Sequence, residues 1–351
     1  MKTIWWDQGR VFLINQRELP TTLKYIECRD ADCVVKAIRN LEIRGAPAIG
    51  VAAAMSLALT AYNSKATERR ELEKELEECA IIIKGARPTA SNPSWALDRV
   101  LDRAYTTIGS VESVKETIIK EVLTLADEDV HTNKLIAVHG SALLESGDVV
   151  GTICNAGWLA TSGEYGTALG IIKFAHEQGK KISVIALETR PVLQGARLTA
   201  FELQQDGIAV KVIPDGAIGY CFSKGMIDKF ICGADRIVWS SGCHTFNKIG
   251  TYTASIAAWW HHVPFYVAAP YSTFDFTHRL DDILIEERDQ KEVTEIFGHR
   301  IVPEDVPALN PAFDITPPSL ISAIITEHGI NYPPFKTHIT PLNRPEHSLG
   351  K

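Results

Sequence analysis

Two kinds of hydrophobic pattern divide this chain. In the first part, apolar positions recur with helical spacing in segments separated by Gly, Pro and Asn. From about Gly151 onward, short apolar runs rich in β-branched residues alternate with helical segments, as is typical of βαβ units. The pattern predicts an α/β fold with a mostly helical N-terminal domain over residues 1–133, opened by a small strand region at 3–25. Residues 134–351 are predicted to form a doubly wound, parallel-sheet (Rossmann-like) domain.

The predicted elements follow from these patterns. The N-terminal helices are predicted at residues 31–43, 46–62, 65–86, 95–105 and 111–133. The later strands are predicted at residues 148–154, 181–187, 208–213, 228–238 and 263–269, with helices between them at 166–178, 197–205, 217–226 and 252–262. In open α/β sheets ligands bind at the carboxyl ends of the strands, so the residues that follow each strand are the first candidates for a site.

Charge and hydropathy narrow the class of protein. The chain of 351 residues has a formal net charge of −7 and no block of basic residues, which argues against nonspecific nucleic-acid binding. The apolar run at residues 46–59 is short and bounded by Gly and Pro, so we expect no membrane span. The opening sequence has no signal-peptide pattern, and we therefore expect a cytoplasmic protein.

The cysteines are predicted to be mostly free thiols. Their number, seven, is odd, and the chain is large, which is typical of a reducing compartment. Cys221, Cys232 and Cys243 are spaced by eleven residues, with His244 beside the last. Zinc sites usually pair ligands two to four residues apart, so we predict small buried apolar residues here and no metal site.

The segment at residues 188–202, ETRPVLQGARLTAFE, is the most conspicuous polar cluster. It follows the predicted strand at 181–187 and contains two arginines, a glutamine and two glutamates around a helix start. Such side chains suit an anionic, hydroxylated ligand at the carboxyl edge of the sheet, and a solvated charged loop is the competing interpretation.

This segment and several others together resemble one family. The motifs are IRGAPAIG from Ile43, TICNAGWLAT with YGTALG from Thr152, GADRI from Gly233, NKIGTY from Asn247 and NPAFDIT from Asn310. In this order they resemble the methylthioribose-1-phosphate isomerases, within a superfamily that also includes ribose-1,5-bisphosphate isomerases and regulatory subunits of translation initiation factor 2B. The resemblance covers essentially the whole chain and implies a sugar phosphate as substrate, with no metal and no cofactor.

The resemblance assigns substrate-binding residues from four places in the chain. Arg44, Gly45 and Ala46 match the family's Arg-Gly-Ala, and they precede an Ala-rich helix whose N-terminal N–H groups attract an anion. The other matches are Arg87 in the RPTA motif, Gln194, and Asn247 with Lys248, which we expect to open the helix of NKIGTY.

Two residues match the family's catalytic pair. Cys154 corresponds to its reactive cysteine, and Asp235 to its proton-donating aspartate. Each is predicted to end a strand on the same edge of the sheet. The isomerisation needs one group to protonate the ring oxygen and another to serve hydrogen transfer from C2 to C1, and both an enediol path and a hydride path are compatible with the pair.

Three alternatives follow from the departures from the family pattern. Ile153 and Trp158 replace residues that the family commonly has beside the cysteine, and the segment at 238–246 is longer than usual. A 5-methylthio substrate is the leading interpretation, because Trp158, Ile153 and the Trp239 loop are expected to add apolar surface and no cation. The second interpretation is an isomerase for 5-deoxyribose 1-phosphate or ribose 1,5-bisphosphate. The third is a noncatalytic regulatory subunit. A dehydrogenase is excluded by the lack of GxGxxG between strand and helix.

The resemblance also implies a homodimer. The family pairs through its Rossmann-like domains, and the predicted helix at 252–262 has two adjacent tryptophans, Trp259 and Trp260. Neighbouring residues on a helix cannot both point inward, so this helix has more bulky apolar surface than one sheet face needs.

Overall fold

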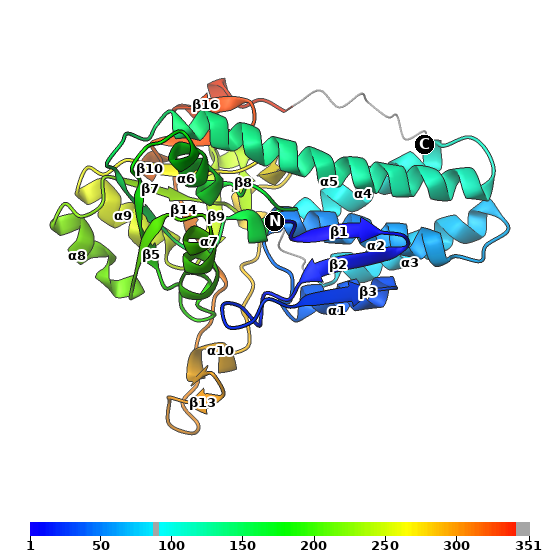
Figure 1. Cartoon of the computed structure of the whole chain (residues 1–351), viewed down its shortest axis with the longest axis horizontal. Coiled ribbons are helices and arrows are strands. Elements are labelled where there is room, and N and C mark those ends of the chain that lie inside the picture. The colour runs from blue at the N-terminus through cyan, green and yellow to red at the C-terminus, as the bar shows by residue number, and fades with distance from the viewer. Residues whose placement is uncertain (87–90, 342–351) are drawn as a thin grey trace.

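The computed structural model describes residues 1–86 and 91–341 and has an α/β architecture. A helical half and a sheet-containing half lie side by side, and one long helix, α5, extends along both (Figure 1). The predicted fold class is therefore correct.

In its described residues, the N-terminal half consists of a small sheet and five helices. Its antiparallel strands are β1 (Ile4–Asp7), β2 (Arg10–Ile14) and β3 (Tyr25–Cys28). Its helices are α1 (Ala31–Arg39), α2 (Ala46–Asn63), α3 (Arg69–Lys84), α4 (Ser91–Thr106) and α5 (Val111–Ser141). All five helices lie close to their predicted positions because Gly, Pro and Asn interrupt the helical pattern at each boundary.

Helix α2 is the centre of this half. It packs against α1, α3, α4 and α5, and its Ala-rich sequence is buried almost all round. By length and composition it is the one helix of the described residues that could cross a membrane, but 78% of that window is buried inside the protein. A helix that is apolar on every side is what the core of a helical layer requires.

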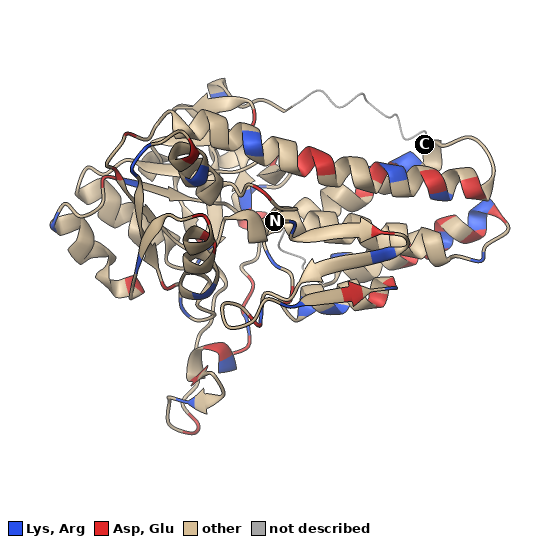
Figure 2. Ribbon diagram, viewed as in Figure 1, with Lys and Arg blue, Asp and Glu red and all other residues tan. Residues whose placement is uncertain are grey.

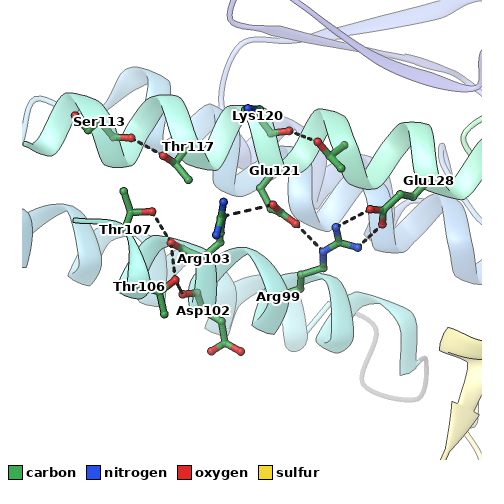
Figure 3. A network of polar contacts seen from close by, with 11 residues as sticks. Arg99, Asp102, Arg103, Thr106, Thr107, Ser113, Thr117, Lys120, Glu121 and Glu128 are labelled. Atoms are coloured by element: carbon green, nitrogen blue, oxygen red, sulfur yellow. Dashed lines mark hydrogen bonds and ion pairs between the residues drawn. The ribbon is translucent and has the colours of Figure 1, made fainter. Parts of the chain in front are cut away.

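Ion pairs fasten α4 to α5. Arg99 of α4 donates to Glu121 of α5 at 2.7 Å and binds Glu128 with both terminal nitrogens (Figure 3). Figure 2 shows acidic and basic residues interspersed along these helices. Helix α5 continues eight residues beyond Asn133, so it passes through the predicted domain boundary and packs against α6 (Ala168–Glu177) of the second half.

The second half is built on a seven-stranded sheet. Its strands are β4 (Val149–Thr152), β5 (Ser183–Leu187), β6 (Ala209–Ile213), β7 (Lys229–Cys232), β10 (Phe265–Ala268), β15 (Ala323–Thr326) and β16 (Gly329–Asn331). The order is β16-β15-β10-β7-β4-β5-β6, parallel except for the edge strand β16. The chain moves outward from β4 through β5 to β6 and then returns to β7 on the other side of β4. The carboxyl ends of β4 and β7 therefore form a topological switch point.

Helices cover both faces of this sheet. One face packs against α5, α6 and α7 (Ala200–Gln205), through buried residues such as Ile171 and Leu203. The opposite face packs against α8 (Ile218–Ser223) and α9 (Thr251–Trp260), through residues such as Phe222 and Ala258. Strands buried on both sides explain why the sequence shows continuous apolar runs instead of alternation.

A second, four-stranded sheet corrects two predictions. Its strands, in the order β11-β8-β9-β14, are β11 (Phe274–Asp275), β8 (Arg236–Val238), β9 (His244–Lys248) and β14 (Phe313–Thr316). The predicted strand at 228–238 is thus two strands, β7 and β8, in different sheets. Asn247 and Lys248 end β9 and do not open a helix, since α9 begins only at Thr251. Both breaks are marked in the sequence, the first by Gly233 and Asp235 and the second by Gly250, but they were missed because apolar residues resume directly after each.

Two further features complete the fold. A projecting arm between β11 and β14 contains α10 (Lys291–Thr294) and the hairpin β12 (Glu295–Ile296) with β13 (His299–Arg300) (Figure 1). Five of the seven cysteines are free, in agreement with the prediction of mostly free thiols, and Cys28 and Cys33 form a disulfide that was not predicted.

Candidate active site

A pocket lies at the switch point of the large sheet. It is lined by the loops that follow β4 and β7, by the start of α2, by β9 and by the base of the arm. It adjoins a larger groove between the two halves, with which it shares Pro47 and Pro270. The pocket thus collects segments that are far apart in the sequence at the sheet edge where ligands bind.

The start of α2 supplies an anion-binding wall. Gly45 is the N-cap residue, with φ +94°, and a Cβ there would lie 2.4 Å from Ala160 Cα, so only glycine fits. No side chain caps the helix, and Ala46 begins it at the pocket wall. Arg44 donates from one terminal nitrogen to Asn155 Oδ1 at 2.8 Å and from the other to Asn155 O at 2.9 Å. A guanidinium beside free helix N–H groups suits a phosphate.

Cys154 and Asp235 line the same pocket. Cys154 is 8% exposed and has φ +61°, an unusual conformation for a residue with a side chain. Its N–H donates to Thr189 Oγ1 and its carbonyl accepts from Thr199 Oγ1, so both sides of the peptide are held. Asp235 stands between β7 and β8, where its N–H donates to Phe246 O at 2.9 Å. The structure therefore brings the two together, while their catalytic roles stay a prediction.

The amide and ammonium groups come from the loop after β5 and from strand β9. Gln194 is 5% exposed, and its Oε1 is a buried acceptor without a hydrogen-bond partner within residues 1–86 and 91–341. Asn247 donates to Thr251 Oγ1 at 3.0 Å. Lys248 Nζ donates to Ala312 O and lies 4.7 Å from the centre of the Phe313 ring. A buried acceptor such as Gln194 Oε1 is costly unless a ligand hydroxyl or N–H reaches it.

The sequence missed one cation of the pocket. Arg288, at the base of the arm, lines the wall and pairs with Glu286 at 3.0 Å and with Glu292. Because two carboxylates flank one guanidinium, this group adds no net positive charge. Nothing in the sequence EERDQKEV distinguishes it from a solvated charged stretch, so only the tertiary structure could place it at the site.

The conspicuous charges at residues 188–202 do not reach the pocket. Arg190 donates to the carbonyls of Pro191 and Val293, and Arg197 donates to four carbonyls, those of Gln16, Arg17, Leu19 and Val192. Gln194 and Val192 are the residues of this segment that line the pocket. Of the polar side chains in this cluster, Gln194 therefore lies at the pocket, while the two arginines stabilise backbone.

Two tryptophans are also misplaced by the sequence argument. Trp158 is buried among Ile14, Leu19 and Leu198, and Trp239 donates from Nε1 to Ile339 O, so neither lines the pocket. The apolar lining includes Leu41, Ile153, Val192 and Phe313. Of the residues expected to add apolar surface, Ile153 alone does so.

Arg87, which was predicted to bind substrate, falls outside the described residues.

The pocket therefore combines basic and apolar walls. Arg44 and Lys248 are cations on its surface, and Asp235 and Cys154 are its groups able to exchange protons. Within residues 1–86 and 91–341, no group of three or more His, Cys, Asp and Glu could hold a metal ion. The arrangement suits a small organic anion with one apolar part and acid–base chemistry at its centre.

Comparisons with known proteins match nearly the whole chain. The sequence model of the Initiation factor 2 subunit family matches residues 42–333. A methylthioribose-1-phosphate isomerase of Desulforamulus reducens is 46% identical, over 97% of this chain and 99% of that protein. The crystal structure of 5-methylthioribose 1-phosphate isomerase from Pyrococcus horikoshii OT3 is 41% identical with a TM-score of 0.86, over 96% of this chain and 94% of that chain. A structure described as subunit delta of translation initiation factor eIF-2B, from A. fulgidus, is 46% identical with a TM-score of 0.84, over 96% and 97% of the two chains.

Proposed function

Because the chain belongs to the Initiation factor 2 subunit family, we propose that it is an aldose–ketose isomerase that converts 5-methylthioribose 1-phosphate to 5-methylthioribulose 1-phosphate in methionine salvage. One observation carries the proposal. The pocket at the switch point holds a thiol and a carboxyl, Cys154 and Asp235, together with the cations Arg44 and Lys248. A noncatalytic ligand-binding subunit would need the cations but not this pair.

The residues divide the reaction between them. Phosphate on the anomeric oxygen prevents spontaneous ring opening, so the ring oxygen must be protonated, and Asp235 supplies that proton. Cys154 serves the transfer of hydrogen from C2 to C1, as base in an enediol path or by stabilising charge in a hydride path. Arg44 and the N-terminus of α2 hold the phosphate, and the low exposure of Cys154 keeps water from the reacting carbons.

The lining favours an apolar 5′ substituent. Leu41, Ile153, Val192 and Phe313 offer a dry surface for a methylthio group. Arg288 is the extra cation that a second phosphate would need, but Glu286 and Glu292 already neutralise it. With Arg44 and Lys248 both serving the 1-phosphate, a second phosphate would be desolvated without a counter-charge, so ribose 1,5-bisphosphate is disfavoured.

A side-by-side assay tests the function. The purified chain, without added metal, is given the 1-phosphates of 5-methylthioribose and 5-deoxyribose, and ribose 1,5-bisphosphate. We expect the highest kcat/KM for the methylthio sugar. A higher value for the bisphosphate would contradict the assigned substrate, and turnover of none of the three would favour the regulatory-subunit alternative suggested by the A. fulgidus structure.

We further propose a homodimer in which α9 lies at the contact. Trp259 and Trp260 are 58% and 71% exposed, and Tyr252 and Ile256 of the same helix are 41% and 42% exposed. Adjacent apolar residues of this size on one surface are typical of an interface. Sedimentation velocity at micromolar concentration is expected to show a dimer, and Trp260→Glu a monomer. A monomeric unsubstituted chain would refute the proposal.

The protein is proposed to act in the cytoplasm, on small molecules alone. The net charge of −7 disfavours phosphate backbones, and the apolar helix α2 is buried in the core. Fractionation of cells that express the full chain is expected to recover it in the soluble cytoplasmic fraction, and a gel-shift assay with DNA and RNA to show no complex. Recovery with membranes, or a salt-sensitive nucleic-acid complex, would contradict this.

A further inference from the structure

Glu202 is a buried carboxylate behind the active-site pocket. It lies on α7 and is 1% exposed. Its Oε2 accepts from Trp158 N at 2.6 Å, and its Oε1 accepts from Asn155 Nδ2 at 2.7 Å and from Leu159 N at 3.2 Å. In the part of the chain that the structure describes, no Lys, Arg or His side chain donates to it. A buried charge held by neutral donors alone is costly, so a carboxylate at this place needs a structural or functional reason.

The carboxylate determines which way the Asn155 amide faces. A carboxylate only accepts hydrogen bonds, so the NH2 group of Asn155 must point toward Glu202. Thr199 Oγ1, 3.3 Å from the same nitrogen, donates its own proton to Cys154 O and can accept here. The amide oxygen is thereby turned to the opposite side, where it accepts from Arg44 at 2.8 Å. The reversed amide would place two donor groups against each other at Arg44.

The loop that carries Asn155 is pressed directly onto the carboxylate. A Cβ on Gly157 would lie 1.9 Å from Glu202 Oε2, so the backbone approaches as closely as glycine allows. Glu202 therefore binds the loop at both its side chain and its backbone. Motion of this carboxyl would move the loop, and with it the groups that hold Arg44.

From these contacts we infer that Glu202 is a positioning residue for substrate: through Asn155 it fixes the Arg44 guanidinium in the orientation that binds the phosphate. Negative charge at Glu202, the amide dipole of Asn155 and positive charge at Arg44 are aligned head to tail, so each hydrogen bond polarises the next. The inference rests on the proposed function only in naming a sugar phosphate as the ligand, since the same relay would position Arg44 for any phosphate.

A double-mutant cycle tests the relay. Glu202→Gln keeps the shape but replaces one acceptor oxygen by a donor. We expect it to raise KM for the sugar phosphate, and the dissociation constant for inorganic phosphate in calorimetry, roughly tenfold, with kcat within about threefold. In an Arg44→Ala background the same substitution should change either constant less than about twofold, because the group through which it acts is gone.

Asp129→Asn is the matched control. Asp129 is a partly buried carboxyl that likewise accepts from a backbone N–H, that of Ser162 at 2.7 Å, but it does not contact Asn155 or Arg44. We expect both phosphate constants to stay unchanged in this variant. Equal losses in Glu202→Gln and Asp129→Asn, or additive losses of Glu202→Gln and Arg44→Ala, would overturn the inference.

A second variant covers a failure to fold. If Glu202→Gln does not fold, Asn155→Ser, which removes the middle of the relay, takes its place in the cycle with Arg44→Ala and with the same two outcomes. Phosphate calorimetry separates the relay from the function. An unsubstituted chain that turns over none of the sugar phosphates would defeat the proposed function, while the phosphate cycle would still decide the role of Glu202.

Discussion

The loops that follow β4 and β5 occupy the same edge of the sheet and use their polar residues in opposite ways. The loop at 153–159 contains no charged residue, yet it brings Cys154 and Asn155 to the pocket. The loop at 188–199 contains two arginines, and both bind backbone carbonyls instead. Charge density along a sequence therefore does not locate a binding site. A guanidinium has five donors, and it satisfies buried carbonyls as readily as a phosphate.

The largest expected effect is in the loop without charges. Cys154→Ser should lower kcat by at least about a hundredfold, because an alcohol is a far weaker acid than a thiol and its anion is not accessible near neutral pH, while KM changes less than about threefold since the phosphate-binding groups remain. Steady-state kinetics on the sugar phosphate measures both constants. An unchanged kcat would show that the cysteine takes no part in the mechanism, and the loop at 153–159 would then have no catalytic role to set against the loop at 188–199.

Arg44, the pocket cation that the uncharged loop holds through Asn155, should affect binding of the substrate phosphate. Arg44→Ala is expected to lower kcat/KM roughly a hundredfold, mostly through KM, because a charged hydrogen-bond partner of the phosphate is lost. Arg44→Lys retains charge without the two-pronged geometry and should recover part of the loss. A KM that stays constant in Arg44→Ala would show that the phosphate binds elsewhere, for example at Lys248.

Arg197 of the loop at 188–199 should affect the free energy of unfolding and not catalysis. Arg197→Ala leaves the carbonyls of Gln16 and Leu19 without their donor, so we expect a loss of about 3 kcal/mol in the free energy of unfolding, with kcat/KM of the folded protein within about twofold. Urea unfolding and kinetics on the same preparation check both. A large loss of kcat/KM in a stable variant would place Arg197 at the substrate and reverse the comparison.

A smaller effect is expected with pH. Burial raises the pKa of Glu202 to about 7, against the hydrogen bonds from Asn155, Leu159 and Trp158, and the nearby Asp206 raises it further. The relay needs the ionised form, so it is intact above that pKa and weakens as pH falls through it. The ratio of the KM of Glu202→Gln to the KM of the unsubstituted chain should fall from roughly tenfold at pH 8 to about twofold at pH 6.

Titration of the substrate phosphate does not affect that ratio, because it is common to both proteins. A ratio that does not change between pH 6 and 8 would show that Glu202 does not titrate in the relay.

The extent of successful prediction differs between fold and site. Helices α1 to α5 and the strands β4 to β6 were predicted closely, since each is one uninterrupted pattern with a clear break at its end. The break between β7 and β8 was missed, although Gly233 and Asp235 mark it, because apolar residues resume directly after it at Ile237 and Val238. Asn247 and Lys248 were assigned to a helix start although they end β9, yet they still line the pocket.

The sequence by itself determined the alternation of strands and helices, and with it the parallel sheet, its functional edge and the family. It did so because hydrophobic periodicity and motif order are local properties of the chain. Only the tertiary structure decided which charges face the ligand. Arg288 enters the pocket from an arm more than a hundred residues after Cys154, Arg197 turns away to bind backbone, and Glu202 reaches Arg44 through Asn155. Such partnerships depend on which loops meet at the switch point, and packing between distant segments, which no local pattern encodes, sets that arrangement.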